Sequence, residues 1–370
     1  MSGTARHSYR VRIAGTADGG SRIPDLTPRE ALERWLGKLR VDRAESTVSS
    51  YAYRLKLFVD WTEHEGIDSI SDLTGWDIES YETHRRNQGI EPLTLKRELE
   101  TLANFLEYCA NIELVDDALP EKVTPPKVPR DAHVDESMLE PEVAEALLQH
   151  YRTHPEKRAT RGHAVLEVAW HTGARLGALR GLDVDDYDAE EQYVAFHHRP
   201  RKETPLKNST DGERLVGLPE AVCEILDEYL ARERHEAFDD HNRRPLFASQ
   251  LGRPTTNTLR IWMYLATVPC HYTECPHGRE RETCEFVDYS KISQCPSSRS
   301  PHQVRTGSIT WQRNRGVPVD VVSKRVNSSP SVIEEHYDKP SKFEEMEKRR
   351  RQHLDQLDLD ADTDNGGADE

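Results

Sequence analysis

Apolar residues recur at spacings of three and four through the first third of the chain, which places them on one face of a helix. Residues 1–25 lack any such period, and we expect them to be disordered. The helical segments that the pattern predicts are Thr27–Leu39, Ser46–Gly66, Ser71–Arg86 and Pro92–Ala110. Ser46 suits an N-cap, Gly66 suits a C-terminal stop, and Trp76 belongs to the apolar face of the third segment. Residues 26–119 are therefore predicted to form a helical domain.

A proline-rich stretch divides the chain. Four prolines between Leu119 and Pro129 exclude a regular helix, so we predict a linker over residues 120–138. A second domain is predicted over residues 139–352, and an Asp-rich acidic tail over residues 353–370. The helical segments of the second domain are Pro141–His154, Thr160–Thr172, Pro219–Arg234, Thr258–Val268, His302–Arg315 and Pro318–Val326.

Two short segments of the second domain have the composition of strands. Tyr193–His197 and Arg214–Leu218 are rich in apolar residues, and they bracket a polar stretch that is typical of a hairpin-like excursion. The fold class that follows is mainly α. A helical domain comes first, and a mixed, mostly helical domain with a small β-sheet comes second.

The charge balance is acidic. The chain has 50 basic and 66 acidic residues among 370, a net charge of −16 and a mean hydropathy of −0.80. No apolar run reaches the roughly 18 residues of a membrane span, and the N-terminus has no apolar signal segment, so we expect a cytoplasmic protein without a membrane partner. Such acidity fits a halophilic, high-salt cytoplasm, in which the Debye length falls to about 3 Å. Net charge therefore does not exclude DNA as a partner.

Three strings carry candidate chemistry. The string TGAR ends at Arg175, near a helix end where the backbone dipole alone favours a cation. His302 and Arg305 share one helix face, although His-x-x-Arg also occurs elsewhere in the chain. Tyr337 ends a short amphipathic segment, where a tyrosine is usually a packing residue. No string is specific by itself, so only their order along the chain is informative.

Arg175, a lysine in the hairpin, His302-x-x-Arg305 and Tyr337 together resemble the tyrosine recombinase (phage integrase, Xer-type) family, including its members in halophilic archaea. The resemblance spans nearly the whole chain. It implies a SAM-like core-binding domain over the N-terminal helices and a catalytic domain over the second half. It also implies a site-specific DNA recombinase or integrase that cleaves and rejoins double-stranded DNA through a 3′-phosphotyrosine intermediate. Such an enzyme needs neither ATP nor a cofactor for catalysis, and works as a homotetramer on DNA.

The resemblance gives each residue a role. Arg175 and Arg305 would neutralise a phosphodiester and stabilise its transition state with paired N–H donors. Tyr337 would attack the phosphorus and form the covalent intermediate. Lys207 in the hairpin would protonate the departing 5′-oxygen, and Lys202 is the competing residue for that role.

Two positions depart from the family pattern. Ala178 stands where the family usually has a carboxylate, which leaves the catalytic His302 without that orienting partner. Asn327 or Ser328 stands where the family usually has His or Trp, so a hydrogen-bond donor is kept and a titrating group is lost. The alternative is therefore a catalytically impaired relative that binds DNA as an architectural or regulatory protein. A type IB topoisomerase shares the chemistry and is a weaker third interpretation.

The second half of the chain contains residues that could contact DNA phosphates and a segment that could contact another protomer. The charged segment after Tyr337 is expected either to pack on a neighbouring protomer or to fold back on its own domain. The basic residues that could face phosphates are Arg152, Lys157, Arg158, Arg161, Arg199, Arg201, Lys202, Lys207, Arg243, Arg244, Arg253 and Arg260.

Four of the six cysteines lie in an insertion at about residues 269–298. The spacing C-x4-C-x8-C-x10-C is formed by Cys270, Cys275, Cys284 and Cys295. We predict a structural zinc ion bound by these thiolates, with His271 and His277 as spare ligands, because a tetrahedral site would order a polar segment. Free or redox-active thiols and disulfides stay open as alternatives. The insertion resembles cysteine-bearing insertions in integrase-like proteins of halophilic archaea, whereas Cys109 and Cys223 are predicted core residues.

Overall fold

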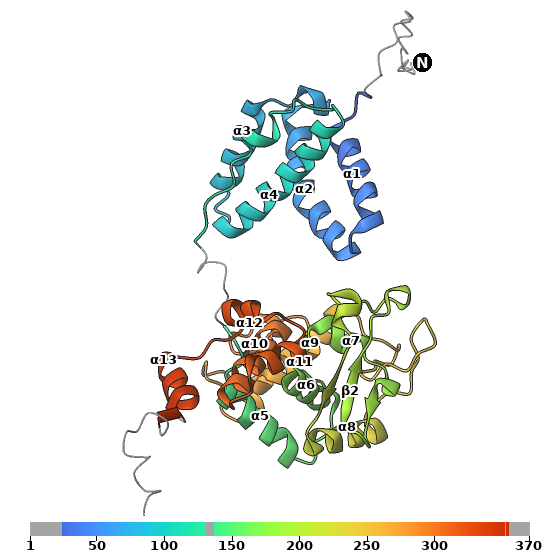
Figure 1. The fold of residues 1–370 in the computed structure, drawn as a ribbon, viewed down its shortest axis with the longest axis vertical. Helices are drawn as coiled ribbons and strands as arrows, with labels where there is room; N and C mark the ends of the chain where they lie inside the picture. Colours follow the sequence, from blue (N-terminus) through green and yellow to red (C-terminus); the bar gives the residue numbers. More distant parts are fainter. Residues whose placement is uncertain (1–23, 130–136, 352, 355–370) are drawn as a thin grey trace, which may run out of the picture. The chain divides into compact units, whose positions relative to one another are not determined.

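The computed structural model describes residues 24–129, 137–351 and 353–354. The chain divides into two compact units, Met1–Val134 and Asp135–Glu370, and each has its own hydrophobic core (Figure 1). Parts of three sequence predictions lie outside the described residues. These parts are residues 1–23 of the disordered segment, residues 130–136 of the linker and residues 355–370 of the acidic tail.

Helices form the described part of the first unit. They are α1 (Pro28–Asp42), α2 (Glu45–Glu65), α3 (Gly75–Asn87) and α4 (Pro92–Asn111), with short 3-10 turns at Ile70–Asp72 and Pro120–Lys122. Aromatic side chains from these helices meet in the core. Trp35 of α1 stacks on Tyr51 of α2 with 5.5 Å between ring centroids, and Phe58 meets Tyr81 of α3 edge-to-face at 5.1 Å. This unit is the helical domain that the apolar spacing predicts.

Helix starts in the first unit differ from the sequence prediction. Helix α2 begins at Glu45 after Ala44, so Ser46 lies inside the helix and is not its N-cap. The predicted third helix is divided, because Thr74 starts α3 with a reciprocal pair of hydrogen bonds to Asp77. With this start Trp76 falls in the first turn of α3, where 75% of its surface is exposed. The prediction that Trp76 lies on a buried face is therefore wrong.

The second unit combines helices with a small sheet. Its α-helices are α5 (Pro141–Thr153), α6 (Arg161–Thr172), α7 (Leu176–Gly181), α8 (Glu220–Arg232), α9 (Thr256–Thr267), α10 (Pro301–Asn314), α11 (Val319–Val326), α12 (Pro330–His336) and α13 (Lys342–Glu344), the last continuing into a π-helical turn, Glu345–Arg350. The antiparallel sheet has the order β1 (Tyr187–Asp188), β2 (Tyr193–Phe196) and β3 (Arg214–Gly217). Strand β1 is missing from the sequence prediction because two residues are too few to show an alternating pattern.

The mainly α fold class with a small sheet is confirmed. Val194 pairs with Tyr187 on one side and with Val216 on the other, so β2 is the central strand.

Among the described residues, we find no helix that combines the length and the apolar character needed to cross a membrane.

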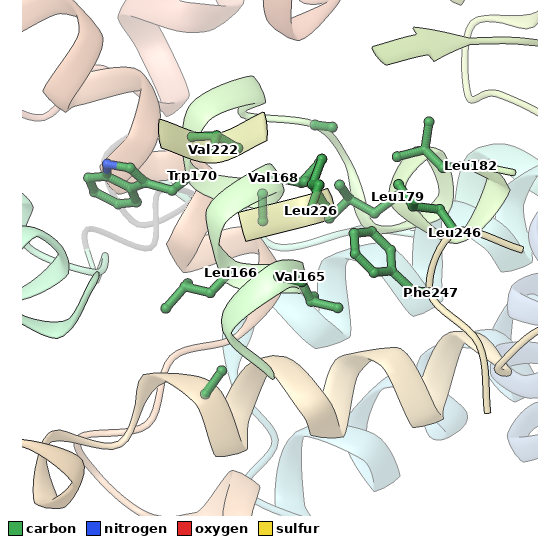
Figure 2. Close-up of a cluster of buried hydrophobic side chains, with 14 of the residues drawn as sticks. Val165, Leu166, Val168, Trp170, Leu179, Leu182, Val222, Leu226, Leu246 and Phe247 are labelled. Atoms are coloured by element: carbon green, nitrogen blue, oxygen red, sulfur yellow. The ribbon is translucent and has the colours of Figure 1, made fainter. Parts of the chain in front are cut away.

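Helix α6 forms the centre of the second unit. Its Val165, Leu166, Val168 and Trp170 are all buried, and Figure 2 shows them on different sides of the helix. Because α6 is apolar almost all round, it can be covered on every side, and it packs against α5, α7, α8, α9 and α10. The C-terminal end of α6, which leads to Arg175, is thereby held by the core.

Two glycines allow α10 to approach α6 closely. A Cβ on Gly307 of α10 would lie 1.9 Å from the carbonyl oxygen of Leu139 and 3.0 Å from the ring of Trp170. Gly173 ends α6 in the left-handed region with φ +58°, and a Cβ there would lie 2.8 Å from Val326. The close contact brings the end of α6 beside the middle of α10, where the candidate arginines lie.

Candidate active site

Three loops and helix ends bring the candidate side chains together. Arg175 follows the left-handed turn at Gly173 and stands at the N-cap of α7. His302 and Arg305 lie in the first two turns of α10, whose start is fixed by Ser300 at its N-cap. Tyr337 is the residue that directly follows α12.

Arg305 is a buried guanidinium whose hydrogen-bond donors are only partly used. Only 2% of the surface of Arg305 is exposed. Its Nη1 donates hydrogen bonds to the carbonyl oxygens of Gly173 at 2.5 Å and Val326 at 2.8 Å. Within the described residues, Nε and Nη2 have no hydrogen-bond partner. Burial, followed by repulsion from Arg175, lowers the pKa of Arg305 to about 10, and Tyr337 acts in the opposite direction. Buried donors without acceptors are costly, so this position is suited to binding an anion.

Tyr337 lies against this guanidinium. Its ring centroid is 4.7 Å from Cζ of Arg305 and 5.3 Å from the ring centroid of His302. Its backbone is fixed from α10, because the hydroxyl of Thr310 donates to the carbonyl oxygen of Tyr337 at 3.0 Å and accepts from the backbone N–H of Lys339 at 3.1 Å. The tyrosine is 8% exposed. A phenol is thus held between a cation and an imidazole.

Asn327 connects the site to the β2–β3 connection. The backbone of Asn327 ends α11 in the left-handed region, and its carbonyl oxygen accepts a 2.6 Å hydrogen bond from Nη1 of Arg175. Its side-chain Oδ1 accepts from Nδ2 of Asn208, and its Nδ2 donates to the carbonyl oxygen of Asp211. The amide of Asn327 is therefore engaged in positioning this connection.

Ser328 differs from Asn327 in this respect. The residue is buried, and its hydroxyl has no hydrogen-bond partner among the described residues. Its backbone is held by Ser323, whose carbonyl oxygen accepts from the Ser328 N–H and whose hydroxyl donates to the Ser328 carbonyl oxygen. Of the two residues that replace the usual His or Trp, Ser328 is the one with an unused buried donor.

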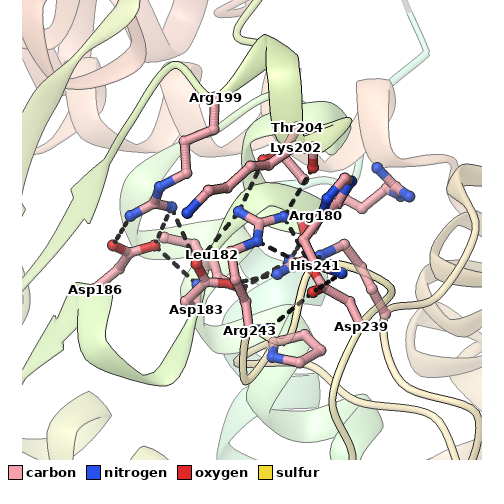
Figure 3. Close-up of polar contacts among 12 residues, drawn as sticks. Arg180, Leu182, Asp183, Asp186, Arg199, Lys202, Thr204, Asp239, His241 and Arg243 are labelled. Carbon is pink, nitrogen blue, oxygen red and sulfur yellow. Dashed lines mark hydrogen bonds and ion pairs between the residues drawn. The ribbon is translucent and has the colours of Figure 1, made fainter.

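The two candidate lysines lie in different parts of the β2–β3 connection. Lys207 directly precedes Asn208, which contacts Asn327 beside Arg175. Lys202 lies in a cluster of charged residues, and its carbonyl oxygen accepts from Nη2 of Arg243 at 3.0 Å (Figure 3). The placement of the backbone therefore favours Lys207 for the role beside the phosphate.

The charged cluster around Lys202 consists of buried ion pairs (Figure 3). Arg243 lies 3.3 Å from Asp183 and 3.0 Å from Asp239, and Arg253 pairs with the same two carboxylates. Burial would raise the pKa of Asp239, but the backbone N–H of Arg243 and the side chain of Arg253 outweigh it and hold the pKa at about 2. These ion pairs anchor the first half of the β2–β3 connection.

The ion pairs change the interpretation of the basic residues. Six of the twelve candidates for phosphate contacts are paired with carboxylates of the same unit, namely Arg152, Arg158, Arg199, Arg243, Arg244 and Arg253. Arg152, for example, lies 2.6 Å from the fully buried Glu167. A basic residue that neutralises a buried acid contributes less to an attractive surface, so the sequence alone overstated the number of cations available to DNA.

Arg214 is a site residue that sequence reasoning missed. It begins β3, and its Nε donates to the carbonyl oxygen of Arg325 at 2.6 Å while its Nη1 donates to Gly212 at 2.9 Å. Burial, followed by repulsion from Arg305 and Arg175, lowers the pKa of Arg214 to about 9. It is thus a third cation beside the other two. No motif marks Arg214, because an arginine at the edge of a strand usually points to solvent.

All six cysteines are free thiols, which disfavours the disulfide alternative. The four cysteines of the insertion line one cavity together with His277. His271 is engaged elsewhere, with Nε2 2.8 Å from the carbonyl oxygen of Leu265, and burial lowers its pKa to about 4. No group of three or more His, Cys, Asp or Glu side chains is already arranged to hold a metal ion in the described parts of the chain. The zinc ion therefore stays a prediction.

Two family models match the chain. The model described as the phage integrase family matches residues 137–342, and the model of the phage integrase N-terminal SAM-like domain matches residues 32–111. The first match alone covers more than half of the 370 residues.

Individual proteins are also similar to this chain. The tyrosine recombinase XerD of Corynebacterium glutamicum is 27% identical over 322 residues, which cover 84% of this chain and 94% of that protein. The Tn1549 transposon integrase, solved in complex with transposon right end DNA, is 16% identical with a TM-score of 0.60, and the match covers 90% of this chain and 99% of that one. The N-terminal domain of a phage integrase/site-specific recombinase from Haloarcula marismortui is 47% identical over 28% of this chain and 100% of that domain, with a TM-score of 0.28.

Proposed function

The chain belongs to the phage integrase family of tyrosine recombinases, and from this premise we propose that it cleaves and rejoins duplex DNA at specific sites through a 3′-phosphotyrosine intermediate on Tyr337. We propose that the reaction needs neither ATP nor a cofactor, since the energy of the broken phosphodiester is kept in the phosphotyrosine bond. Double-stranded DNA as the substrate also implies a cytoplasmic site of action.

The observation that carries this proposal is the half-satisfied guanidinium of Arg305 in contact with Tyr337. Nε and Nη2 of Arg305 are buried donors without partners among the described residues, and the tyrosine ring lies 4.7 Å from the guanidinium carbon. A phosphate that accepted these two N–H groups would be presented to the phenol. Arg175 adds a second cation to the same place, since it is close enough to lower the pKa of Arg305.

The proposed cleavage step moves the phosphoryl group from the 5′-oxygen of the DNA to Tyr337. Oη of Tyr337 attacks the phosphorus, a phosphotyrosine bond forms, and the bond from phosphorus to the 5′-oxygen breaks. His302, whose ring centroid lies 5.3 Å from that of the tyrosine, accepts the phenolic proton. Lys207 donates a proton to the departing 5′-oxygen. Rejoining is the reverse, with the 5′-hydroxyl of a partner strand as the nucleophile.

Ser328 is proposed as the accessory donor to a phosphate oxygen. Its buried hydroxyl has no partner among the described residues, whereas the amide of Asn327 contacts Asn208 and Asp211. In this proposal Asn327 is a positioning residue, because it connects Arg175 to the segment that follows Lys207.

We propose a homotetramer on DNA. Joining two duplexes requires four strand breaks, and each chain supplies one Tyr337, so four chains are needed. In the described residues the segment after this tyrosine folds back on its own unit, because Lys348 lies 2.9 Å from Glu142 and Arg349 lies 2.6 Å from Asp338. The mass of the Tyr337→Phe protein on two target duplexes tests the stoichiometry, and a complex of two chains per pair of duplexes would contradict it.

The test of cleavage is covalent capture. The protein is incubated in high salt with nicked fragments of genomic DNA from its source, and DNA that stays attached after denaturation is sequenced. We expect adducts at defined sites for the wild type and none for Tyr337→Phe. Tyr229→Phe is the matched control, because Tyr229 is a buried tyrosine of α8 outside the site, and it should give wild-type adducts. An adduct that survives in Tyr337→Phe would show that the nucleophile is assigned wrongly.

The second candidate function is a DNA-binding relative without turnover. Ala178, which is buried beside the site in place of a carboxylate, favours it, since His302 then lacks that group as an orienting partner. In this case the wild-type protein would bind the same DNA sites as Tyr337→Phe, and neither would form an adduct.

A further inference from the structure

The cysteine-rich insertion has almost no hydrophobic core of its own. Between Pro269 and Ser298 the structure contains only short 3-10 turns, and Ile292 is the single hydrophobic residue that is buried. Ordering a backbone costs roughly 1–2 kcal/mol per residue, which one buried side chain cannot offset for a segment of this length. A segment with this composition needs a cross-link, and its four free thiols do not form disulfides.

The four cysteines of the insertion line one small cavity. Cys270, Cys275, Cys284 and Cys295 come from widely separated positions of the insertion, yet all of them line the same cavity of about 20 Å³. Such a volume holds little more than one water-sized occupant. The thiols are not yet arranged at coordinating positions in the described chain, so an occupant would draw them together by rotation of their side chains.

Three of the four cysteines begin a turn of the same form. The carbonyl oxygen of the cysteine accepts a hydrogen bond from the backbone N–H three residues later, at 3.0 Å for Cys275, 3.2 Å for Cys284 and 3.1 Å for Cys295. The turn after Cys275 uses Gly278 at φ +63°, a conformation that favours glycine. The same turn also occurs at other residues of the insertion, such as Glu280 and Asp288, so the cysteines lie in a segment built from successive short turns.

Two arginines lie beside the cavity. Nη1 of Arg281 lies 2.9 Å from Sγ of Cys270, and the cavity lining includes Arg279. Four thiolates around one divalent cation would carry a net charge of −2, and Arg281 places a cation against one of them, whereas Arg279 also pairs with Glu285 at 3.7 Å.

The insertion is also connected to the start of α10. Three residues after Cys295 lies Ser298, whose hydroxyl donates to the carbonyl oxygens of Ile292 and Cys295. Arg299 then exchanges hydrogen bonds with the hydroxyl of Thr267 at the end of α9, and its side chain donates to the carbonyl oxygen of Pro296. The next residue is the N-cap of α10.

We propose that Cys270, Cys275, Cys284 and Cys295 bind one zinc ion, and that this ion fixes the connection between α9 and α10 and so the position of Arg305. Four sulfur ligands select a thiolate-preferring metal such as Zn²⁺ over Mg²⁺ or Ca²⁺, and a fully occupied tetrahedral shell makes the ion structural. The inference concerns a part of the chain that the proposed recombinase mechanism does not use.

The metal half of the proposal is tested by composition. The full chain is produced with zinc in the medium, and its metal content and intact mass are measured under non-denaturing conditions. We expect one zinc per chain in the wild type and a loss of nearly all of it in Cys275→Ser and Cys284→Ser. Cys223→Ala is the matched control, since Cys223 lies in α8 away from the insertion, and it should keep its zinc. Replacement by Co²⁺ should give intense thiolate-to-cobalt absorption.

Several results would overturn the metal half. A wild type with only trace zinc and no cobalt absorption would do so, as would equal zinc content in Cys275→Ser. Titration of the native chain for thiols that shows two fewer than the six of the sequence would point to a disulfide instead. None of these measurements involves DNA, so their outcome is independent of the recombinase proposal.

The positioning half is tested by amide hydrogen exchange. Removal of zinc with a chelator should raise exchange in the first two turns of α10, residues 301–308, and leave that of α8 unchanged. Unaltered exchange in α10 after complete removal of the metal would overturn this half. Re-addition of Zn²⁺ should restore protection, which irreversible unfolding would not allow.

Discussion

At the scale of single residues, the candidate site gathers three cations, Arg305, Arg175 and Arg214. Burial, followed by repulsion from Arg175, lowers the pKa of Arg305 to about 10, and burial, followed by repulsion from Arg305 and Arg175, lowers the pKa of Arg214 to about 9. Keeping Arg305 protonated at neutral pH therefore costs free energy in the DNA-free protein. A phosphate would remove part of that cost, so binding and stability should be linked at this position.

We predict that inorganic phosphate stabilises the protein through Arg305. At a hundredfold excess over Kd, a ligand adds about 2.7 kcal/mol to the free energy of unfolding, which corresponds to a rise in Tm of roughly 5–10 °C for the second unit. Arg305→Gln should show almost no rise when Tm is measured at constant ionic strength with chloride as the balancing anion. Arg180→Gln, which changes an arginine of the separate charged cluster, should keep the wild-type response. Equal responses in the two variants would contradict the assignment.

Lys207 and Lys202 can be separated by the leaving group. Lys207→Ala should slow cleavage by about 10²- to 10⁴-fold, because the 5′-oxygen then leaves without a general acid. A substrate with sulfur in place of that oxygen should restore the rate, since a thiolate is a far weaker base and leaves without a proton. Single-turnover cleavage on both substrates checks this. Lys202→Ala is the control and should behave as the wild type, and the reverse pattern would transfer the role to Lys202.

The sequence predicted the residues whose order along the chain is characteristic, and it missed those that depend on packing. Arg175, His302, Arg305 and Tyr337 were proposed from three short strings, and in the structure the ring of Tyr337 contacts both Arg305 and His302. Arg214 could not be found, because its burial depends on the contact between β3 and α11. The choice between Asn327 and Ser328 also needed the hydrogen bonds of the folded chain.

At the scale of elements, the close contact between α6 and α10 positions the site. The start of α10 is fixed by the reciprocal hydrogen bonds of Ser300 and Gln303, and its middle is held against α6 by Gly307. The apolar spacing predicts where helices lie along the chain. Their exact starts depend on capping side chains, which the spacing does not show. Thr74, which starts α3 later than predicted, is the same case in the first unit.

Gly307→Ala should destabilise the second unit. The added Cβ would lie 1.9 Å from the carbonyl oxygen of Leu139, and because this atom belongs to the backbone, α10 itself must shift. We expect a loss of about 1–3 kcal/mol or more in the free energy of unfolding, and weaker covalent capture of DNA. Denaturant titration measures the first. Gly162→Ala in α6 is the control, since its Cβ would lie an ordinary 3.6 Å from Ala266 and should change stability by less than about 1 kcal/mol.

The buried ion pairs around the β2–β3 connection predict a pH dependence. Because the pKa of Asp239 is lowered to about 2, its stabilising contribution is fully present above the unfolded value of about 4 and is lost as the pH falls from there toward 2. Asp239→Asn should therefore cost roughly 2 kcal/mol at neutral pH, and the difference from the wild type should shrink between about pH 4 and pH 2. Denaturant titrations across this range measure it. Asp240→Asn, at an exposed neighbouring position, should have little effect, and a pH-independent loss in Asp239→Asn would contradict the explanation.

At the scale of the whole molecule, the sequence predicted two units of different kinds and the structure has them. The apolar spacing of the first 110 residues predicts helices that share a core, and the described helices do so. Net charge was less informative, because acidic and basic side chains are distributed by tertiary contacts. Asp183 and Asp239, for example, belong to the −16 balance and yet face arginines inside the second unit.

Binding to duplex DNA should therefore persist in molar salt. Screening at a Debye length of about 3 Å removes the long-range repulsion between a chain of net charge −16 and DNA, while contacts such as that proposed for Arg305 act at shorter range. Fluorescence anisotropy with the Tyr337→Phe protein, from about 0.2 M to above 1 M potassium chloride, measures the affinity. A random duplex is the control and should lose its binding as salt rises. Loss of binding to the captured site over the same range would contradict the expectation.

The hydrogen bonds of the Thr310 hydroxyl bear on which protomer supplies the tyrosine for each DNA strand. It holds the carbonyl oxygen of Tyr337 and the N–H of Lys339 from the same helix that carries Arg305, so the chain fixes its own tyrosine on both sides. In the proposed mechanism, we expect a tyrosine held in this way to act in cis, on the strand bound by the arginines of its own chain. Two damaged protomers, one lacking the arginine and one lacking the tyrosine, would therefore not complement each other in a mixed assembly.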